Sequence, residues 1–135
     1  MKKSEKTWQV RQVEDSPTLS LEGFTMYRIL DGSLMDNIGC ELVKIKCGEV
    51  LEPHYHTNSH SIILVLSGKG FAMLDNKRFP IQKYSVINVP PGVIHGLESS
   101  DEELIVYGFQ SPGIISEDKN ADIYFTKDNR KGTVM

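Results

Sequence analysis

The sequence has no long hydrophobic run, and its longest fully apolar stretch is Ile62 to Leu66. A helix that spans a bilayer needs about 20 such residues, so none is expected here. Positive charge is also scarce, since 15 Lys and Arg stand against 18 Asp and Glu, a net charge of −3. Proteins that bind nucleic acid or anionic membranes usually carry excess basic residues, so we expect neither partner. The basic start, Met1 to Lys6, is not followed by the apolar segment of a secretion signal, and we expect a cytoplasmic protein.

Cysteine is almost absent, with only Cys40 and Cys47 in the chain. The residues between them alternate polar and apolar side chains, as those of a half-buried strand do. An extended segment of this length separates its ends by about 23 Å, whereas a disulfide needs Cα atoms within about 7 Å. We therefore expect two free thiols, which fit a reducing compartment.

Helical periodicity is absent as well, and short β-rich runs separated by turn residues recur instead, a pattern that predicts an all-β sandwich or barrel. The runs are Phe24–Leu30, Glu41–Lys46, Ser61–Leu66, Phe71–Leu74, Arg78–Ile81, Ser85–Val89, His95–Leu97, Leu104–Phe109 and Asp122–Thr126. The chain shows no repeat or linker, so we expect one domain over residues 1–135. Its core barrel is expected at about 24–110, with loose polar ends at 1–6 and 128–135.

Only four histidines are present, and three of them, His54, His56 and His60, stand close together. Residues two apart on a strand point to the same face, so His54 and His56 would project together. His95 follows a Pro-Gly turn and is the obvious third ligand for a metal, since imidazole commonly binds zinc, copper, iron and nickel. A pair of histidines is a weak signal by itself, because most histidines lie on the surface or are hydrogen-bonded in the core.

Two longer motifs strengthen this interpretation. The segment Gly48-Glu-Val-Leu-Glu-Pro-His54-Tyr-His56-Thr-Asn-Ser-His60-Ser61, followed by six residues and Gly68, resembles the first motif of the cupin family. Pro90-Pro91-Gly92-Val93-Ile94-His95 is similar to the second, Pro-x-Gly-x-x-His. The resemblance, which is shared in part with germins and legumin-type globulins, implies a cupin double-stranded β-helix, a jelly-roll-like barrel.

The resemblance also implies a ligand set for a divalent transition metal, with iron, manganese, zinc, nickel and copper all open. His54, His56 and His95 match three of the family's four ligands. The fourth, a glutamate, is replaced: counting back from Gly68 puts Ser61 in its place, and counting forward from His56 puts His60 there. We prefer Ser61 and expect it to face inward with His60 outward, whereas a four-histidine site would need a bulge that turns His60 inward.

The second motif departs from the family pattern at two further positions. Tyr84 stands where the family has a glycine before a strand, and Ser99 stands where it has an asparagine.

The resemblance implies two functions, which the residues do not separate. The first is a metal-dependent enzyme acting on a small polar metabolite, as a dioxygenase, isomerase, decarboxylase or lyase, with Tyr55, Tyr84 and Glu98 as candidate acid–base residues. The second is a small-molecule-binding protein without turnover, which the missing carboxylate ligand favours. We also expect a homodimer, because Ile62, Leu64 and Leu66 would form an apolar patch on the outer face of their strand.

Overall fold

The computed structural model describes residues 9–21, 23–30, 38–114, 120–127 and 131–133. Within these ranges the chain forms one short 3-10 helix, η1 (Val13–Asp15), and twelve strands, so the predicted all-β class is confirmed. The strands are β1 (Thr18–Leu21), β2 (Phe24–Leu30), β3 (Gly39–Ile45), β4 (Val50–Tyr55), β5 (His60–Ser67), β6 (Lys69–Leu74), β7 (Lys77–Gln82), β8 (Val86–Val89), β9 (His95–Ser99), β10 (Leu104–Ser111), β11 (Asn120–Phe125) and β12 (Lys131–Thr133).

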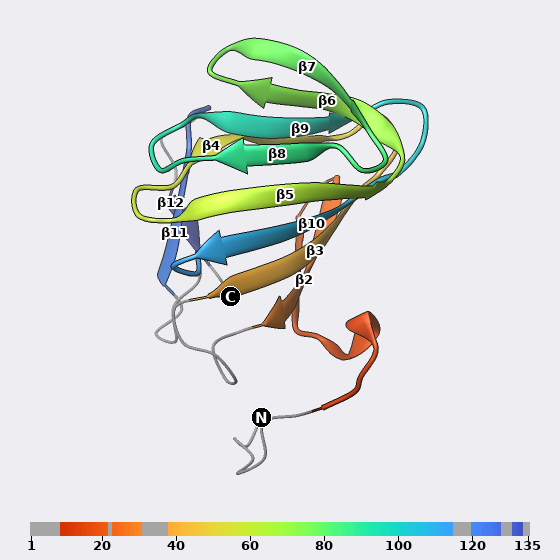
Figure 1. The fold of residues 1–135 in the computed structure, drawn as a ribbon, viewed down its shortest axis with the longest axis vertical. Coiled ribbons are helices and arrows are strands. Elements are labelled where there is room, and N and C mark those ends of the chain that lie inside the picture. The colour runs from red at the N-terminus through yellow and green to blue at the C-terminus, as the bar shows by residue number, and fades with distance from the viewer. Residues whose placement is uncertain (1–8, 22, 31–37, 115–119, 128–130, 134–135) are drawn as a thin grey trace.

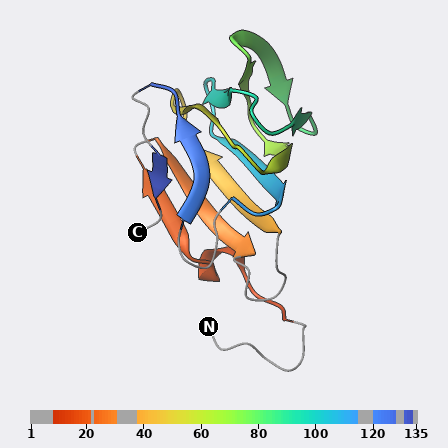
Figure 2. The same ribbon diagram turned by 90° about the vertical axis from the view of Figure 1, so that its left-hand side faces the viewer.

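The strands form two six-stranded antiparallel sheets (Figure 1). The first sheet has the order β1-β2-β3-β10-β5-β8, and the second has the order β12-β11-β4-β9-β6-β7. The chain crosses repeatedly between the sheets, as in a jelly roll. Strands β4 and β8 finish, and β5 and β9 begin, at the left-hand end of Figure 1, which we call the site end. Figure 2 shows the fold from that side.

Alternation along the strands builds one core between the sheets. In β5, for example, Ile63 and Val65 are buried, while Ile62 lies on the outer face and is exposed. Strands β8 and β10 show the same alternation, and the inward side chains of both sheets form a continuous apolar interior. Its buried residues are Phe24, Val43, Ile45, Leu51, Ile63, Val65, Ala72, Ile81, Ile87, Val89, Leu97, Leu104 and Val106.

Two turn positions explain features of the sequence motifs. Gly68 has a φ of 89°, and a Cβ atom there would overlap the backbone carbonyl of Glu103, so both conformation and space require glycine. Tyr84 has a φ of 72° in the turn between β7 and β8. The backbone at Tyr84 thus keeps the left-handed conformation that favours glycine, although the residue is a tyrosine.

The strands extend beyond the expected barrel range. Strand β1 adds to one edge of the first sheet, while β11 and β12 form the edge of the second. The expectation of a loose end at 128–135 is wrong for Lys131–Thr133, which is strand β12. A polar segment can form an edge strand because the pairing uses backbone groups. The other expected loose end, residues 1–6, lies outside the described residues.

Both cysteines are free thiols, as expected, with Cys40 buried and Cys47 exposed. Among the residues that the structure describes, no helix has the length and apolar character needed to cross a membrane.

Candidate metal centre

A register shift in the second sheet turns His54 toward the interior. Between β4 and β9, Leu51 pairs with Leu97 and His54 pairs with His95. Strand β4 therefore has one residue more than β9 between these two pairs. Such a shift is a β-bulge, and it moves every following side chain to the opposite face. Leu51 and His54 are therefore both buried, although three positions separate them. Pro53 stands within the shift, where its missing N–H is tolerated.

The second motif is tied to the first through the backbone. The amide of Gly92 donates a hydrogen bond to the carbonyl of His56 at 2.7 Å. Gly92 has a φ of 84°, which glycine adopts without strain, and the turn that it forms leads directly into β9. This contact holds the start of β9, and with it His95, beside the end of β4.

The three buried histidines converge, with one ligand atom from each lying within 4.8 Å of the others. The ring centroids of His54 and His95 are 4.3 Å apart, and that of His56 lies 5.1 Å from the first and 5.0 Å from the second. Each Nδ1 atom contacts a backbone carbonyl. The carbonyls belong to Glu52 for His54 at 2.6 Å, Asp122 for His56 at 2.5 Å and Val93 for His95 at 2.9 Å.

These carbonyl contacts assign the tautomer of each ring. A carbonyl oxygen only accepts hydrogen bonds, so each Nδ1 must carry the proton. Each Nε2 is then left with a free lone pair. Metal-bound histidines in proteins are held in the same way, by a second hydrogen bond that fixes the ring and its tautomer. The donor set therefore fits a divalent transition metal.

Burial keeps all three rings neutral. It holds the pKa of His54 well below the ordinary value, and the neighbouring His95 adds to this shift. Burial likewise lowers the pKa of His56, against the opposing effect of Asp122, and it lowers the pKa of His95 to about 4. Neutral imidazole is the form that ligates metal, so the site needs no deprotonation at pH 7.

Asp122 supports the site from outside the region that the motifs cover. Its backbone carbonyl accepts a hydrogen bond from Nδ1 of His56. Its carboxylate accepts hydrogen bonds from the loop that follows His56. The donors are the amide and hydroxyl of Thr57 at 2.7 Å each, the amide of Asn58 at 2.8 Å and the amide of Ser59 at 3.1 Å. The sequence motifs gave no signal for this residue, because β11 reaches the site only through pairing with β4.

Ser61 and His60 face as the strand alternation predicts. Ser61 is 2% exposed on the inner face of β5. His60 is exposed, and its Nε2 lies 2.6 Å from Oδ1 of Asn88 in the neighbouring strand. The pairing of β5 with β8 shows no register shift there, so His60 is not turned inward. The four-histidine alternative is therefore wrong for this structure, and His60 lies apart from the other three.

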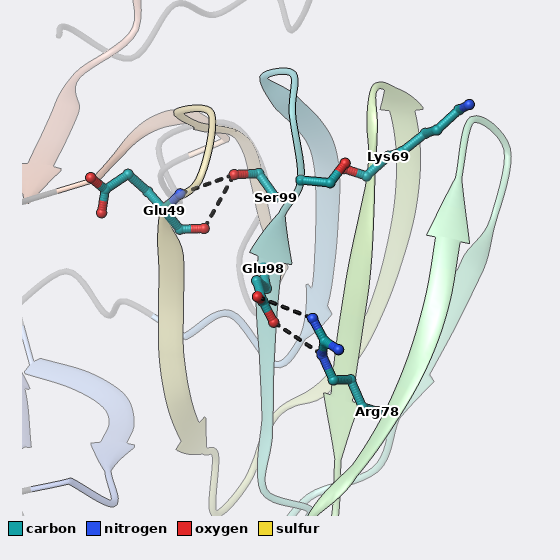
Figure 3. A network of polar contacts seen from close by, with 6 residues as sticks. Glu49, Lys69, Arg78, Glu98 and Ser99 are labelled. Carbon is teal, nitrogen blue, oxygen red and sulfur yellow. Dashed lines mark hydrogen bonds and ion pairs between the residues drawn. The ribbon is translucent and has the colours of Figure 1, made fainter.

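The three candidate acid–base residues are not brought to the histidines. Glu98 points away from the interior and forms an ion pair with Arg78 at 3.2 Å (Figure 3). Tyr84 is 71% exposed in its turn, and its backbone pairs with Val65, toward the opposite end of β5 from Ser61. Tyr55 alternates with the inward-facing histidines, and its ring stacks on Tyr124 with centroids 5.2 Å apart.

Comparison with known proteins identifies the class to which this architecture belongs. Residues 41–107 match the family model described as the cupin domain, and the chain is a small cupin-domain protein. An uncharacterized protein of Methanocaldococcus jannaschii is 26% identical over 85 residues, covering 62% of this chain and 68% of the relative.

Solved structures share the fold at low sequence identity. A predicted oxalate decarboxylase from Thermotoga maritima has a TM-score of 0.71 and 18% identity, covering 77% of this chain and 99% of that one. A double-stranded β-helix protein from Klebsiella pneumoniae has a TM-score of 0.70 and 18% identity, with coverage of 87% and 96%. Salicylate 1,2-dioxygenase from Pseudoaminobacter salicylatoxidans, solved with gentisate, has a TM-score of 0.63 and 18% identity, with coverage of 73% and 27%. Likeness at this level establishes the fold alone.

Proposed function

We propose that the protein binds one divalent transition-metal ion through His54, His56 and His95 and acts as a metalloenzyme on a small polar molecule. The observation that carries this proposal is the convergence of three buried imidazoles, each with its Nδ1 proton bound to a carbonyl. Structural neighbours that include a dioxygenase and a predicted decarboxylase support it. The reactions within reach are dioxygenation, isomerisation, decarboxylation and lyase chemistry.

When bound, such a metal supplies Lewis-acid chemistry, or redox chemistry if the ion is iron, manganese or copper. The residues of this chain hold the donors in place. The carbonyls fix the ring orientations, and Phe125 packs against His54 with ring centroids 5.6 Å apart. Because Phe125 is buried, it closes the site on that side with apolar surface.

Metal analysis of protein purified without added metal tests the proposal. We expect about one metal ion per chain in the wild type and none in His56→Ala, since two imidazoles rarely hold a metal ion. His60→Ala is the matched control and should keep the metal, because His60 faces outward. Equal metal loss in both variants, or no uptake by the wild type, would contradict the assignment. A substrate screen under air, with dioxygen consumption recorded, then tests for turnover.

A binding protein without turnover is the second candidate, and one observation favours it. Ser61 occupies the position in which the family carries a carboxylate ligand, and a serine hydroxyl is a poor ligand for these metals. In that case the screen would find ligands that bind without being changed. Wild-type protein that contains no metal but binds a small molecule would establish this alternative.

We also propose a homodimer that pairs the outer face of the first sheet. Ile62 is 46% exposed, and Phe109 and Val86 on the strands beside it are 38% and 64% exposed. Sedimentation should give about twice the 15.2 kDa chain mass for the wild type and the chain mass for Ile62→Asp. Val10→Asp is the control, because Val10 is exposed outside the strands. A wild-type species of one chain mass would refute the dimer.

The expected cytoplasmic location is likewise a proposal, which the two free thiols support.

A further inference from the structure

Three buried polar atoms of the first sheet have no hydrogen-bond partner among the described residues: Oε2 of Glu41, Oγ of Ser61 and Oε1 of Gln110. Their side chains are at most 5% exposed. They come from β3, β5 and β10, which are adjacent in the sheet. Gln110 of β10 pairs directly with Ser61 of β5. Glu41 of β3 pairs with Gly108, which lies two residues before Gln110 in β10. Glu41, Ser61 and Gln110 therefore form one cluster.

The cluster faces the interior. Glu41 lies on the same face of β3 as Val43, and Ser61 lies on the same face of β5 as Ile63. Val43 and Ile63 both belong to the apolar core. Buried polar groups are nearly always hydrogen-bonded in folded proteins. Three orphaned atoms in one place therefore call for a partner outside the chain's own structure.

The cluster also lies at the site end of the barrel. Glu41 and Ser61 stand near the beginnings of their strands, and Gln110 stands near the end of β10. Pro112 lies two residues after Gln110. Its backbone carbonyl accepts a hydrogen bond at 2.7 Å from the hydroxyl of Ser59, which lies in the loop after His56. The polar cluster of the first sheet therefore lies at the same end of the barrel as the three histidines of the second.

The free atoms define what they can recognise. The Gln110 side chain hydrogen-bonds to Glu41, which leaves one carboxyl oxygen and one amide oxygen as acceptors. The Ser61 hydroxyl can donate or accept. An anionic ligand would be repelled by Glu41 whenever that group is ionised, and Arg28, whose positive charge acts on Glu41, offsets part of the attraction of Glu41 for a cation. Two acceptors and a hydroxyl suit a neutral molecule with neighbouring hydroxyl groups.

We propose that Glu41, Ser61 and Gln110 form a recognition subsite for a neutral small molecule that carries adjacent hydroxyl groups, facing the histidine site across the barrel. The subsite names the substrate class of the proposed function, and it rests on that function only in placing the bound molecule near the metal. Binding at the subsite itself can be measured on metal-free protein, so the two proposals fail separately.

The binding test uses matched pairs of probes on the full chain, with and without metal. NMR titrations compare D-ribose with 2-deoxy-D-ribose, which lacks one of two neighbouring hydroxyls, and sorbitol with gluconate, which adds a carboxylate. We expect D-ribose and sorbitol to bind at least about tenfold more tightly than 2-deoxy-D-ribose and gluconate. Ser61→Ala and Gln110→Met should each weaken the binding of D-ribose and sorbitol about tenfold. Equal binding within the pairs, or no binding by ribose and sorbitol, would overturn the subsite.

A stability measurement needs no ligand. Ser61→Ala removes an orphaned hydroxyl and should leave the unfolding midpoint of the metal-free protein unchanged or higher. Ser99→Ala is the matched control, because Ser99 is equally buried but its hydroxyl bonds to the carbonyls of Lys46 and Glu49. That variant should be clearly less stable than the wild type. A comparable loss in Ser61→Ala would show a structural role and overturn the proposal, as would loss of metal uptake to the extent seen in His56→Ala.

Discussion

The carboxylate of Asp122 accepts four hydrogen bonds from the loop that follows His56, and Asp122→Ala removes all four at once. The backbone carbonyl that holds Nδ1 of His56 remains in the variant. Its position, however, depends on the same loop and strand that the carboxylate joins. The substitution therefore tests whether this segment of β11 positions the histidine or merely lies beside it.

The size of the effect follows from the exposure of the partners. A hydrogen bond to a charged group contributes about 1.5–3 kcal/mol when it is well shielded. Thr57 and Asn58 are exposed, so solvent screens most of this contribution. We expect Asp122→Ala to lower the free energy of unfolding by about 2 kcal/mol in total, and Asp122→Asn, which keeps one acceptor oxygen, by about half as much. Metal affinity should fall about tenfold in the alanine variant, as for other residues that orient a ligand.

Urea unfolding gives the stability change, and competition with a chelator gives the metal affinity. Asp101→Ala is the control, because it removes the same charge from an exposed carboxylate that accepts a hydrogen bond from the hydroxyl of Ser100. If Asp122→Ala matches Asp101→Ala in both measurements, Asp122 neither stabilises the loop nor positions His56. A stability loss without any change in metal affinity would show that the Asp122 carboxylate stabilises the loop but does not position His56.

Three further substitutions probe the backbone and the buried carboxyl. Gly96→Ala places a Cβ atom 2.8 Å from the carbonyl oxygen of Leu51, so it should push β4 and β9 apart at the register shift. We expect it to lower the free energy of unfolding, measured by thermal unfolding, by about 1–3 kcal/mol and to weaken metal binding. Unchanged stability would contradict this prediction. Tyr84→Gly relieves a positive φ and should stabilise the protein by up to about 1 kcal/mol, whereas a lower melting temperature would show that the side chain matters more. Burial raises the pKa of Glu41 to about 7 from 4.5, although Gln110 and a nearby arginine oppose the shift. The folded protein therefore binds this proton more tightly, and the associated stability is present below pH 4.5 and lost as the pH rises toward 7. Relative to Glu41→Gln, the wild type should lose up to about 1.4 kcal/mol per pH unit in that window, and a constant difference across it would contradict the shift.

The sequence was sufficient to predict the fold class and to single out the residues of the histidine cluster. Alternating runs identify strands because side chains on a strand point alternately to two faces. The two motifs supplied His54, His56 and His95, which the structure brings together. The inward orientation of Ser61 also followed from strand alternation together with the count back from Gly68, and no register shift disturbs the pairing of β5 with β8.

Other features depend on contacts between segments far apart in the chain, which local patterns do not record. The register shift between β4 and β9 is invisible until the two strands are paired. Asp122 contacts a loop more than sixty positions earlier, at a separation of 66 residues from His56. The positions of the acid–base candidates depend on such contacts as well. Tyr55 is adjacent to His54 and His56 in the chain and therefore points to the opposite face of the strand. Tyr84 lies in an exposed turn, and Glu98 pairs with Arg78.

Two buried serines show how the fold divides stability from recognition. At the end of the barrel away from the histidines, the Ser99 hydroxyl donates to the carbonyl of Lys46. The same hydroxyl contacts the carbonyl of Glu49 and accepts a hydrogen bond from the backbone amide of Glu49 (Figure 3). At the site end, the Ser61 hydroxyl is equally buried and has no partner among the described residues. Leaving a buried polar group unpaired costs about 1–3 kcal/mol. A structural serine would be satisfied as Ser99 is, so the unpaired state of Ser61 is best explained by a partner that arrives from outside the chain.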